Sequence, residues 1–162
     1  MNEAATKEAE WQSAFSRTQY DDILDISVLD DEQAYKKQLS VLMDYKEKSR
    51  EHGAYVAGFV NIMVEGVKNS QISEESAKGF ITGMREADEE KQRTYQPLFL
   101  QHQKYADDMM AYLNFLYTKK AEWEIVDGSV NFEDTDLNTE FNALVSNLTA
   151  SEAKLNQMMQ SN

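Results

Sequence analysis

The sequence predicts an all-α protein, an up-and-down helical bundle of four to five helices with one accessory β-hairpin at about residues 122–132. Apolar residues recur at intervals of three and four along most of the 162 residues, as on the buried face of a helix. One proline and six glycines leave few positions that oppose helix formation. A single segment, EWEIVDGSVNF, instead alternates apolar and polar residues around Asp-Gly, which is typical of a hairpin.

The length and composition fit one helical domain over residues 1–162, with residues 1–5 expected to form a flexible amino-terminal segment. A chain of this length with 41% hydrophobic residues can bury about two thirds of its unfolded surface in one core. The sequence has no cysteine, which excludes disulfides, thiol nucleophiles and cysteine-based metal sites.

The first half of the chain predicts two helices. Residues 3–24 place apolar side chains among charged ones, as an amphipathic helix does. Asp30 followed by Gln33 has the spacing of a capping box and predicts the start of a second helix. From Tyr35 an apolar face continues to about Lys68, so we expect this helix to be the longest.

A new helix is predicted after a break at residues 69–71. Ser73 supplies an N-cap, and the next two residues are acidic, which favours the positive end of a helix. This third helix should reach about Tyr95. Pro97 then either begins a fourth helix or kinks one continuous helix, and the sequence leaves both alternatives open.

An apolar stripe follows Pro97, with residues spaced four and three apart. Such a stripe ordinarily fills a core, and the alternative is that it lines a pocket for a small apolar ligand or lipid inside the bundle. The candidate residues are His102, Tyr105, Met109, Tyr112 and Leu116.

The hairpin is predicted to turn at Asp127-Gly128, the pair favoured in a type I′ turn. An isolated two-stranded hairpin is marginal, so its apolar face should lie on the helices. That face contains Trp123, Ile125, Val130 and Phe132. The opposite side of the hairpin is expected to be exposed. Either it offers an edge to a protein partner, or the hairpin has no partner and only covers one end of the core. This opposite side contains Glu124, Val126, Ser129 and Asn131.

Two further helices are predicted after the acidic link at residues 133–136. Leu137 and Phe141 begin the apolar face of a short helix. Thr149 and Glu152 have capping-box spacing and predict the start of a last helix.

The charge excludes some classes of partner. The net charge is −13, from 29 acidic and 16 basic residues spread over every segment, so no basic surface is expected for nucleic acid or for anionic lipid headgroups. The most apolar window, residues 54–67, is shorter than the roughly 20 residues of a membrane-spanning helix and contains Asn61 and Glu65. We expect neither nucleic-acid binding nor a transmembrane span.

No pattern in the sequence predicts a catalytic, metal or cofactor site. The histidines are His52 and His102, and the residues three positions before them are Ser49 and Phe99. A carboxylate-bridged di-iron site would need glutamates there. A calcium loop starting at Asp127 would need glycine sixth and glutamate twelfth, and neither is present. We therefore expect a protein that is not an enzyme and holds no cofactor.

The hairpin region resembles the uncharacterised lipoproteins of the enterobacterial envelope typified by YiaF. The similarity lies in an aromatic-x-Val/Ile-x-x-Gly-x-Val/Ile-x-Phe strand pair followed by Glu-Phe/Tyr-Asn. The residues that carry it are Trp123, Ile125, Gly128, Val130 and Phe132, then Glu140, Phe141 and Asn142. Residues 8–10, 14–15 and 29–33 are similar too.

The resemblance implies a compartment and no chemistry. It implies a periplasmic, membrane-anchored lipoprotein whose acylated cysteine stood just before Asn2, where Met1 now stands. Without the resemblance, a cytoplasmic location is the alternative.

Two functions are consistent with these features. The first is a non-enzymatic protein-interaction or accessory module at the envelope, and the alternative is a carrier of a small apolar ligand or lipid. A continuous internal cavity would favour the carrier, whereas a filled core with a contiguous exposed apolar patch would favour the interaction module.

Overall fold

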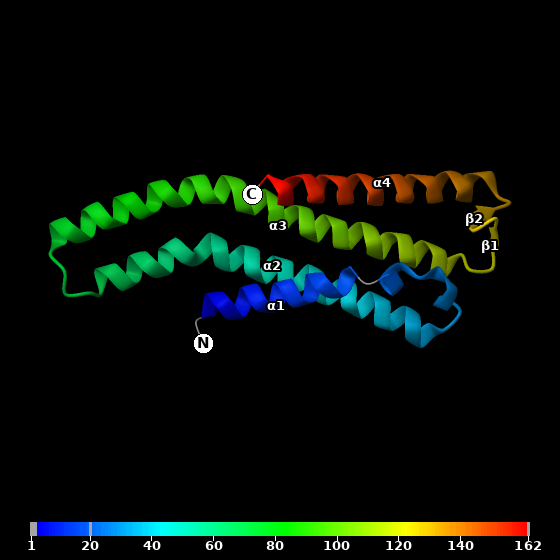
Figure 1. The fold of residues 1–162 in the computed structure, drawn as a ribbon, viewed down its shortest axis with the longest axis horizontal. Coiled ribbons are helices and arrows are strands. Elements are labelled where there is room, and N and C mark those ends of the chain that lie inside the picture. The colour runs from blue at the N-terminus through cyan, green and yellow to red at the C-terminus, as the bar shows by residue number, and fades with distance from the viewer. Residues whose placement is uncertain (1–2, 20, 162) are drawn as a thin grey trace.

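Four α-helices, two short 3-10 helices and one hairpin make up the computed structural model, which describes residues 3–19 and 21–161 (Figure 1). In chain order these are α1 (Glu3–Thr18), η1 (Asp21–Leu24), η2 (Ile26–Val28), α2 (Glu32–Lys68), α3 (Glu74–Thr118), β1 (Trp123–Val126), β2 (Ser129–Phe132) and α4 (Thr135–Gln160). The predicted all-α bundle with an accessory hairpin is confirmed.

The first helix is shorter than predicted at its carboxyl end. It ends at Thr18, whose hydroxyl donates to the carbonyl oxygen of Phe15 at 2.8 Å. Asp25 then caps η2 by accepting from the amide of Ser27 at 2.9 Å. Thr and Asp side chains bond nearby backbone groups in this way, which competes with helix continuation.

The described part of the amino terminus is helical. Residues 1 and 2 lie outside the described part of the chain, and Glu3 to Ala5 form the first residues of α1. The acidic Glu3 in the first turn is favourable at the positive end of the helix.

Helix α2 reaches Lys68 as predicted, but its cap is one residue later than expected. Asp31, not Asp30, accepts from the amides of Gln33 at 2.8 Å and Ala34 at 3.3 Å. Asp30 and Asp31 are adjacent, so either could be the cap when only the sequence is known. In the structure the side chain of Asp31 is the one that reaches the first amides of the helix.

Helix α3 is continuous through Pro97, so the single-helix alternative is correct. Proline removes one backbone hydrogen bond and crowds the carbonyl four residues earlier. Both Pro97 and Arg93, which carries that carbonyl, are exposed, so water can satisfy the freed oxygen. Figure 1 shows α3 bowed along its length rather than straight.

The hairpin has the predicted register, with Trp123 opposite Phe132 and Val126 opposite Ser129. Asp127 and Gly128 have φ values of 53° and 80°, the left-handed conformations that a type I′ turn requires. Phe132 is buried, but Ile125 is 54% exposed. The prediction that this whole face lies on the helices is therefore wrong beside the turn, because the hairpin contacts α4 mainly through β2.

Helix α4 is one helix, so the predicted break before Thr149 does not occur. Its cap is Asp134, which accepts from the amides of Asp136 and Leu137 at 2.8 and 3.0 Å. Leu155 and Ser151 are buried against the bundle, and this packing outweighs the local capping preference of Thr149.

The helices differ in length, which divides the molecule into two parts (Figure 1). Around the first part, called the body, α1 and α4 lie along α2 and α3. The second part, called the arm, consists of residues 56–68 of α2, 74–95 of α3 and the loop between them, and it extends beyond both α1 and α4. Among the described residues, the main buried apolar cluster has no member between Tyr45 and Leu98, although Val64 of the arm is itself buried.

Candidate functional site

Aromatic and histidine side chains meet where α1, α2 and α3 converge in the body. Trp11 of α1 stacks on His52 of α2, with ring centroids 5.4 Å apart. The edge-to-face contact between Trp11 and His102 of α3 has a centroid separation of 5.0 Å. Both histidines of the chain therefore touch the same indole ring. Phe15, Tyr45 and Phe99 complete this cluster, called the aromatic cluster.

His102 is a buried neutral base. Its side chain has no exposed surface, and burial lowers its pKa to about 4. Its Nδ1 atom lies 2.5 Å from the hydroxyl of Tyr45, whose own pKa is raised by burial and by nearby Tyr105. Both groups are thus uncharged near pH 7, and the tyrosine hydroxyl can donate to the imidazole.

The other polar atoms of the aromatic cluster lack partners. Within the described part of the chain, no hydrogen bond reaches Nε1 of Trp11, Nδ1 of His52 or Nε2 of His102, although all three atoms are buried. Burial lowers the pKa of His52, and the charge of Glu8 partly opposes this. Among the described residues, neither histidine is hydrogen-bonded to a carboxylate, and the hydrogen bond found for this pair joins His102 to the hydroxyl of Tyr45.

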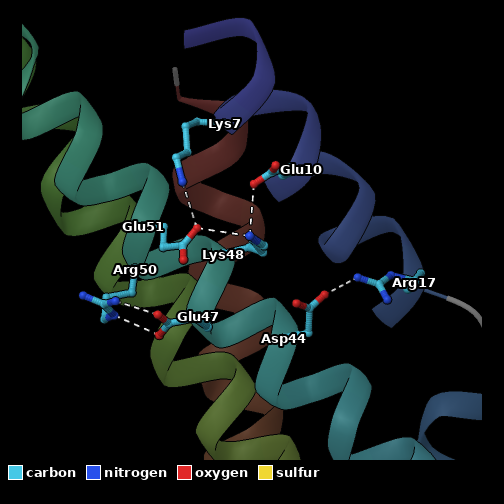
Figure 2. Close-up of polar contacts among 8 residues, drawn as sticks. All are labelled: Lys7, Glu10, Arg17, Asp44, Glu47, Lys48, Arg50 and Glu51. Carbon is cyan, nitrogen blue, oxygen red and sulfur yellow. Dashed lines mark hydrogen bonds and ion pairs between the residues drawn. The ribbon is translucent and has the colours of Figure 1, made fainter. Parts of the chain in front are cut away.

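Ion pairs fix α1 along α2 and so position Trp11 over His52. Figure 2 shows Lys7 of α1 bonded to Glu51 of α2 at 3.1 Å, and Lys48 of α2 bonded to Glu10 of α1 at 3.0 Å. Arg17 pairs with Asp44 further along the same two helices. Ion pairs this exposed contribute at most about 1 kcal/mol each to the stability of the protein. Their main effect is on how α1 is aligned along α2.

A groove begins at the aromatic cluster and runs along the arm. Its volume is about 570 Å³, within the roughly 300–1,000 Å³ typical of small-molecule sites. Trp11 and His52 lie at its body end, and Glu8, Asp88 and Lys91 are the charged residues that line it. The apolar lining includes Tyr55, Val56, Phe59, Val60, Met63, Met84, Ala87, Tyr95, Leu98 and Phe99.

Several exposed apolar side chains lie on the arm around the groove. Between residues 59 and 95, six large apolar side chains are more than a third exposed. They are Phe59 (40%), Ile62 (56%), Met63 (39%), Ile72 (48%), Phe80 (53%) and Tyr95 (38%). Phe59, Met63 and Tyr95 also line the groove. Isolated exposed apolar residues are normal, whereas large exposed apolar patches are in general typical of binding surfaces. We call these six side chains together the apolar face of the arm.

The stripe proposed from the sequence as a ligand lining lies in the body core. His102, Met109 and Leu116 have no exposed surface, Tyr105 is 7% exposed, and Tyr112 is half-buried. None of them lines the groove. They pack among one another and with residues of α2 and α4, so the stripe fills space between helices.

The groove was not identified from the sequence, although signals for its walls were present. Phe59 and Met63 fall in the most apolar window, and Gly53 lies just before it. A Cβ atom on Gly53 would lie 2.9 Å from the Cβ of Phe99, so this glycine lets α2 and α3 approach closely at the base of the arm.

The outer side of the hairpin is exposed. Glu124, Val126, Ser129 and Asn131 all face solvent, and Val126 is 43% exposed. A shallow hollow beside them is lined by further acidic residues, including Glu133. This surface is polar, in contrast to the apolar face of the arm.

Metal ligation and membrane crossing find no support in the described part of the chain. Among the described side chains, which leave out those of residues 20–22 and 90, no three His, Asp or Glu groups lie close enough together to share a metal ion. Each helix of the same part of the chain is too short or too polar to cross a membrane.

Comparison with known proteins gives no relative. No protein-family model, no curated protein and no solved structure matches this chain significantly.

Proposed function

We propose that this protein is a non-enzymatic interaction module that binds a protein partner through the apolar face of its arm. The observation that carries the proposal is the concentration of exposed Phe59, Ile62, Met63 and Phe80 where α1 and α4 no longer cover α2 and α3. Leaving these side chains in water costs free energy, at about 25 cal/mol for each Å² of apolar surface. A partner that covers them recovers that free energy.

The packing of the body is consistent with this proposal. His102, Met109 and Leu116 have no exposed surface, so the stripe that the sequence offered as a ligand lining is closed to solvent. Burial lowers the pKa of both histidines, and both rings pack against Trp11, which favours a structural role for them.

The proposed location is the bacterial envelope. It rests on the resemblance of the hairpin region to enterobacterial envelope lipoproteins, which implies an acylated cysteine before Asn2 and a periplasmic chain. A cytoplasmic interaction module is the alternative. Fractionation of the host, followed by mass spectrometry of the amino-terminal peptide, distinguishes the two, because only the lipoprotein carries acyl chains.

Site-specific photo-crosslinking tests the interaction surface. A photoreactive amino acid at Phe80 or Ile62 should give a discrete adduct with one protein in host cells, because both side chains are on the apolar face. The matched control is Met43, which is 61% exposed but lies on the part of α2 inside the body. Adducts of equal yield from Met43 and Phe80, or none from Phe80 and Ile62, would contradict the proposal.

A carrier of a small apolar ligand or lipid is the second candidate, and the groove of about 570 Å³ favours it. Native mass spectrometry of the protein purified gently from its host tests this role. A bound small molecule that is lost from Met63→Trp, which would fill the groove, supports the carrier. If native mass spectrometry finds the chain without bound mass and the photoreactive residue at Phe80 gives a protein adduct, the interaction module is supported.

A further inference from the structure

We infer that the partner of the arm is a second copy of this chain, packed antiparallel about a twofold axis so that two arms form one four-helix bundle. This inference rests on the proposed function, since it names the occupant of the apolar face. It uses the continuity between the covered and uncovered parts of α2 and α3.

The side of α2 that faces α1 changes in character from the body to the arm. In the body, the side of α2 that faces α1 carries Asp44, Lys48 and Glu51, which pair with charges on α1 (Figure 2). Continuing along the same side at intervals of three and four, the next residues are Tyr55, Phe59 and Ile62. The strip that pairs with a charged helix in the body becomes apolar on the arm, so its partner there should be apolar too.

The geometry of the bundle sets the shape of that partner. In the body, α2 and α3 are accompanied by two more helices, one from each end of the chain (Figure 1). On the arm both are missing at once. A second arm has the same two antiparallel helices and the same apolar face as the first. A twofold axis between the two copies lets the apolar face of each arm cover that of the other.

The charge distribution favours pairing at the arm. Residues 56–95 contain seven acidic and five basic residues, so the arm has a net charge of only −2 while the whole chain has −13. Two copies repel each other least where their arms meet. Lys91 and Asp88 both line the groove, so charges of opposite sign are available to pair between the two copies.

The dimensions of the arm bound the interface. At 1.5 Å of rise per residue, the 13 arm residues of α2 and the 22 of α3 are roughly 20 and 33 Å long, and two helices side by side are roughly 20 Å wide. The face therefore projects roughly 400–600 Å², which puts the dimer at the small end of interfaces that bury about 800 Å² per partner.

The arrangement predicts which residues meet. The arm of α2 runs from residue 56 to the loop at about residue 70, so Met63 is near its middle. In an antiparallel pair the middle of one arm meets the middle of the other, while the tip residue Ile72 meets the base of the other arm. Two tips packed end to end would instead place the two Ile72 side chains together.

Oligomeric state in solution is the first test. Sedimentation velocity of the full chain should give twice the chain mass at micromolar concentration. Met63→Asp should raise the dimer dissociation constant at least tenfold while leaving the helical circular dichroism unchanged. The control Met43→Asp changes another exposed methionine of α2, outside the arm, and should leave the dimer intact. A monomeric parent, or equal effects of the two variants, overturns the inference.

Single-cysteine crosslinking tests the orientation, and the absence of native cysteine makes it clean. A short bis-maleimide should link Met63→Cys to itself efficiently and Ile72→Cys poorly. The reverse result would overturn the antiparallel arrangement.

The two proposals fail separately. If the parent chain is monomeric and the photoreactive residue at Phe80 captures a different protein, the second copy is wrong and the interaction module stands. If neither dimer nor adduct forms, both are wrong.

Discussion

His102 ties the stability of the body to pH. It is fully buried, and its one hydrogen bond is to Tyr45. Its pKa is about 4 in the folded protein, whereas an unperturbed histidine has a pKa near 6.5. Between these two values the unfolded chain binds a proton that the folded chain excludes, so acid favours unfolding.

This residue makes a prediction about urea unfolding. The stabilising contribution of the neutral imidazole should be fully present above pH 6.5 and lost as pH falls to about 4. The total is on the order of 3 kcal/mol, at 1.36 kcal/mol per unit of pKa difference. His102→Gln should flatten the dependence of unfolding free energy on pH in this window.

The control is His52→Gln, which removes the partly exposed histidine and should retain most of the parental slope. Identical slopes for the parent and His102→Gln between pH 4 and 6.5 would falsify the assignment.

At the residue scale, the sequence predicted which kinds of side-chain interaction occur better than it predicted which residues make them. The aspartate cap of α2 was expected at Asp30 and lies at Asp31, because neighbouring aspartates look alike until the backbone geometry is known. The pairing of both histidines with Trp11 could not be predicted, since these residues are 41 or more positions apart and meet only through the packing of three helices.

At the scale of helices and strands, local chemistry and packing compete. The hairpin could be predicted to the residue because Asp127-Gly128 selects one turn type and the turn sets the register. Thr149 has an equally good local capping signal, but it lies inside α4. Asp127 and Gly128 are exposed, so the turn adopts the conformation that its own residues favour. Leu155 and Ser151 are buried, and their packing keeps α4 helical past the capping sequence at Thr149.

The contact between α2 and α3 makes a second prediction. Gly53→Ala should destabilise the protein by about 1–3 kcal/mol, because the new methyl group would overlap Phe99 at the point of closest approach. Gly58→Ala is the matched control further along the same helix. Nothing lies within 4 Å of the position that its new methyl group would take, so the better helix propensity of alanine should stabilise the protein by up to about 1 kcal/mol.

Thermal unfolding of the two variants measures this difference. Stabilisation of similar size in both would show that α2 and α3 do not approach as closely as Gly53 indicates.

At the scale of the whole molecule, helix length decides what is exposed. Helices α2 and α3 have 37 and 45 residues, whereas α1 and α4 have 16 and 26. Periodicity in the sequence predicted an apolar face along α2 to about Lys68 and along the part of α3 that follows Pro97. It could not show that the covering helices end halfway, because a face awaiting a partner has the same period as one that is already buried.

The division into body and arm predicts uneven hydrogen exchange along α3. Amides of residues 76–92 should exchange faster than those of residues 100–116 of the same helix, because few buried side chains hold the arm closed. Protection of the arm should rise with protein concentration as second copies bind. Uniform protection along α3 at every concentration would contradict both expectations, and mass spectrometry of peptic peptides measures them.

Pro97 gives the molecule a mechanical property. It interrupts the hydrogen-bond ladder of α3 where the body ends and the arm begins, and about 35 Å of helix separate it from the first residue of α3 at 1.5 Å per residue. A helix is easiest to bend where that ladder is broken. By simple leverage, a change of about 10° there would swing the tip of the arm through roughly 6 Å, about the pitch of one helical turn. Bending at Pro97 would therefore move the tip of the arm relative to the body, provided that α2, which is one unbroken helix from Glu32 to Lys68, bends with it.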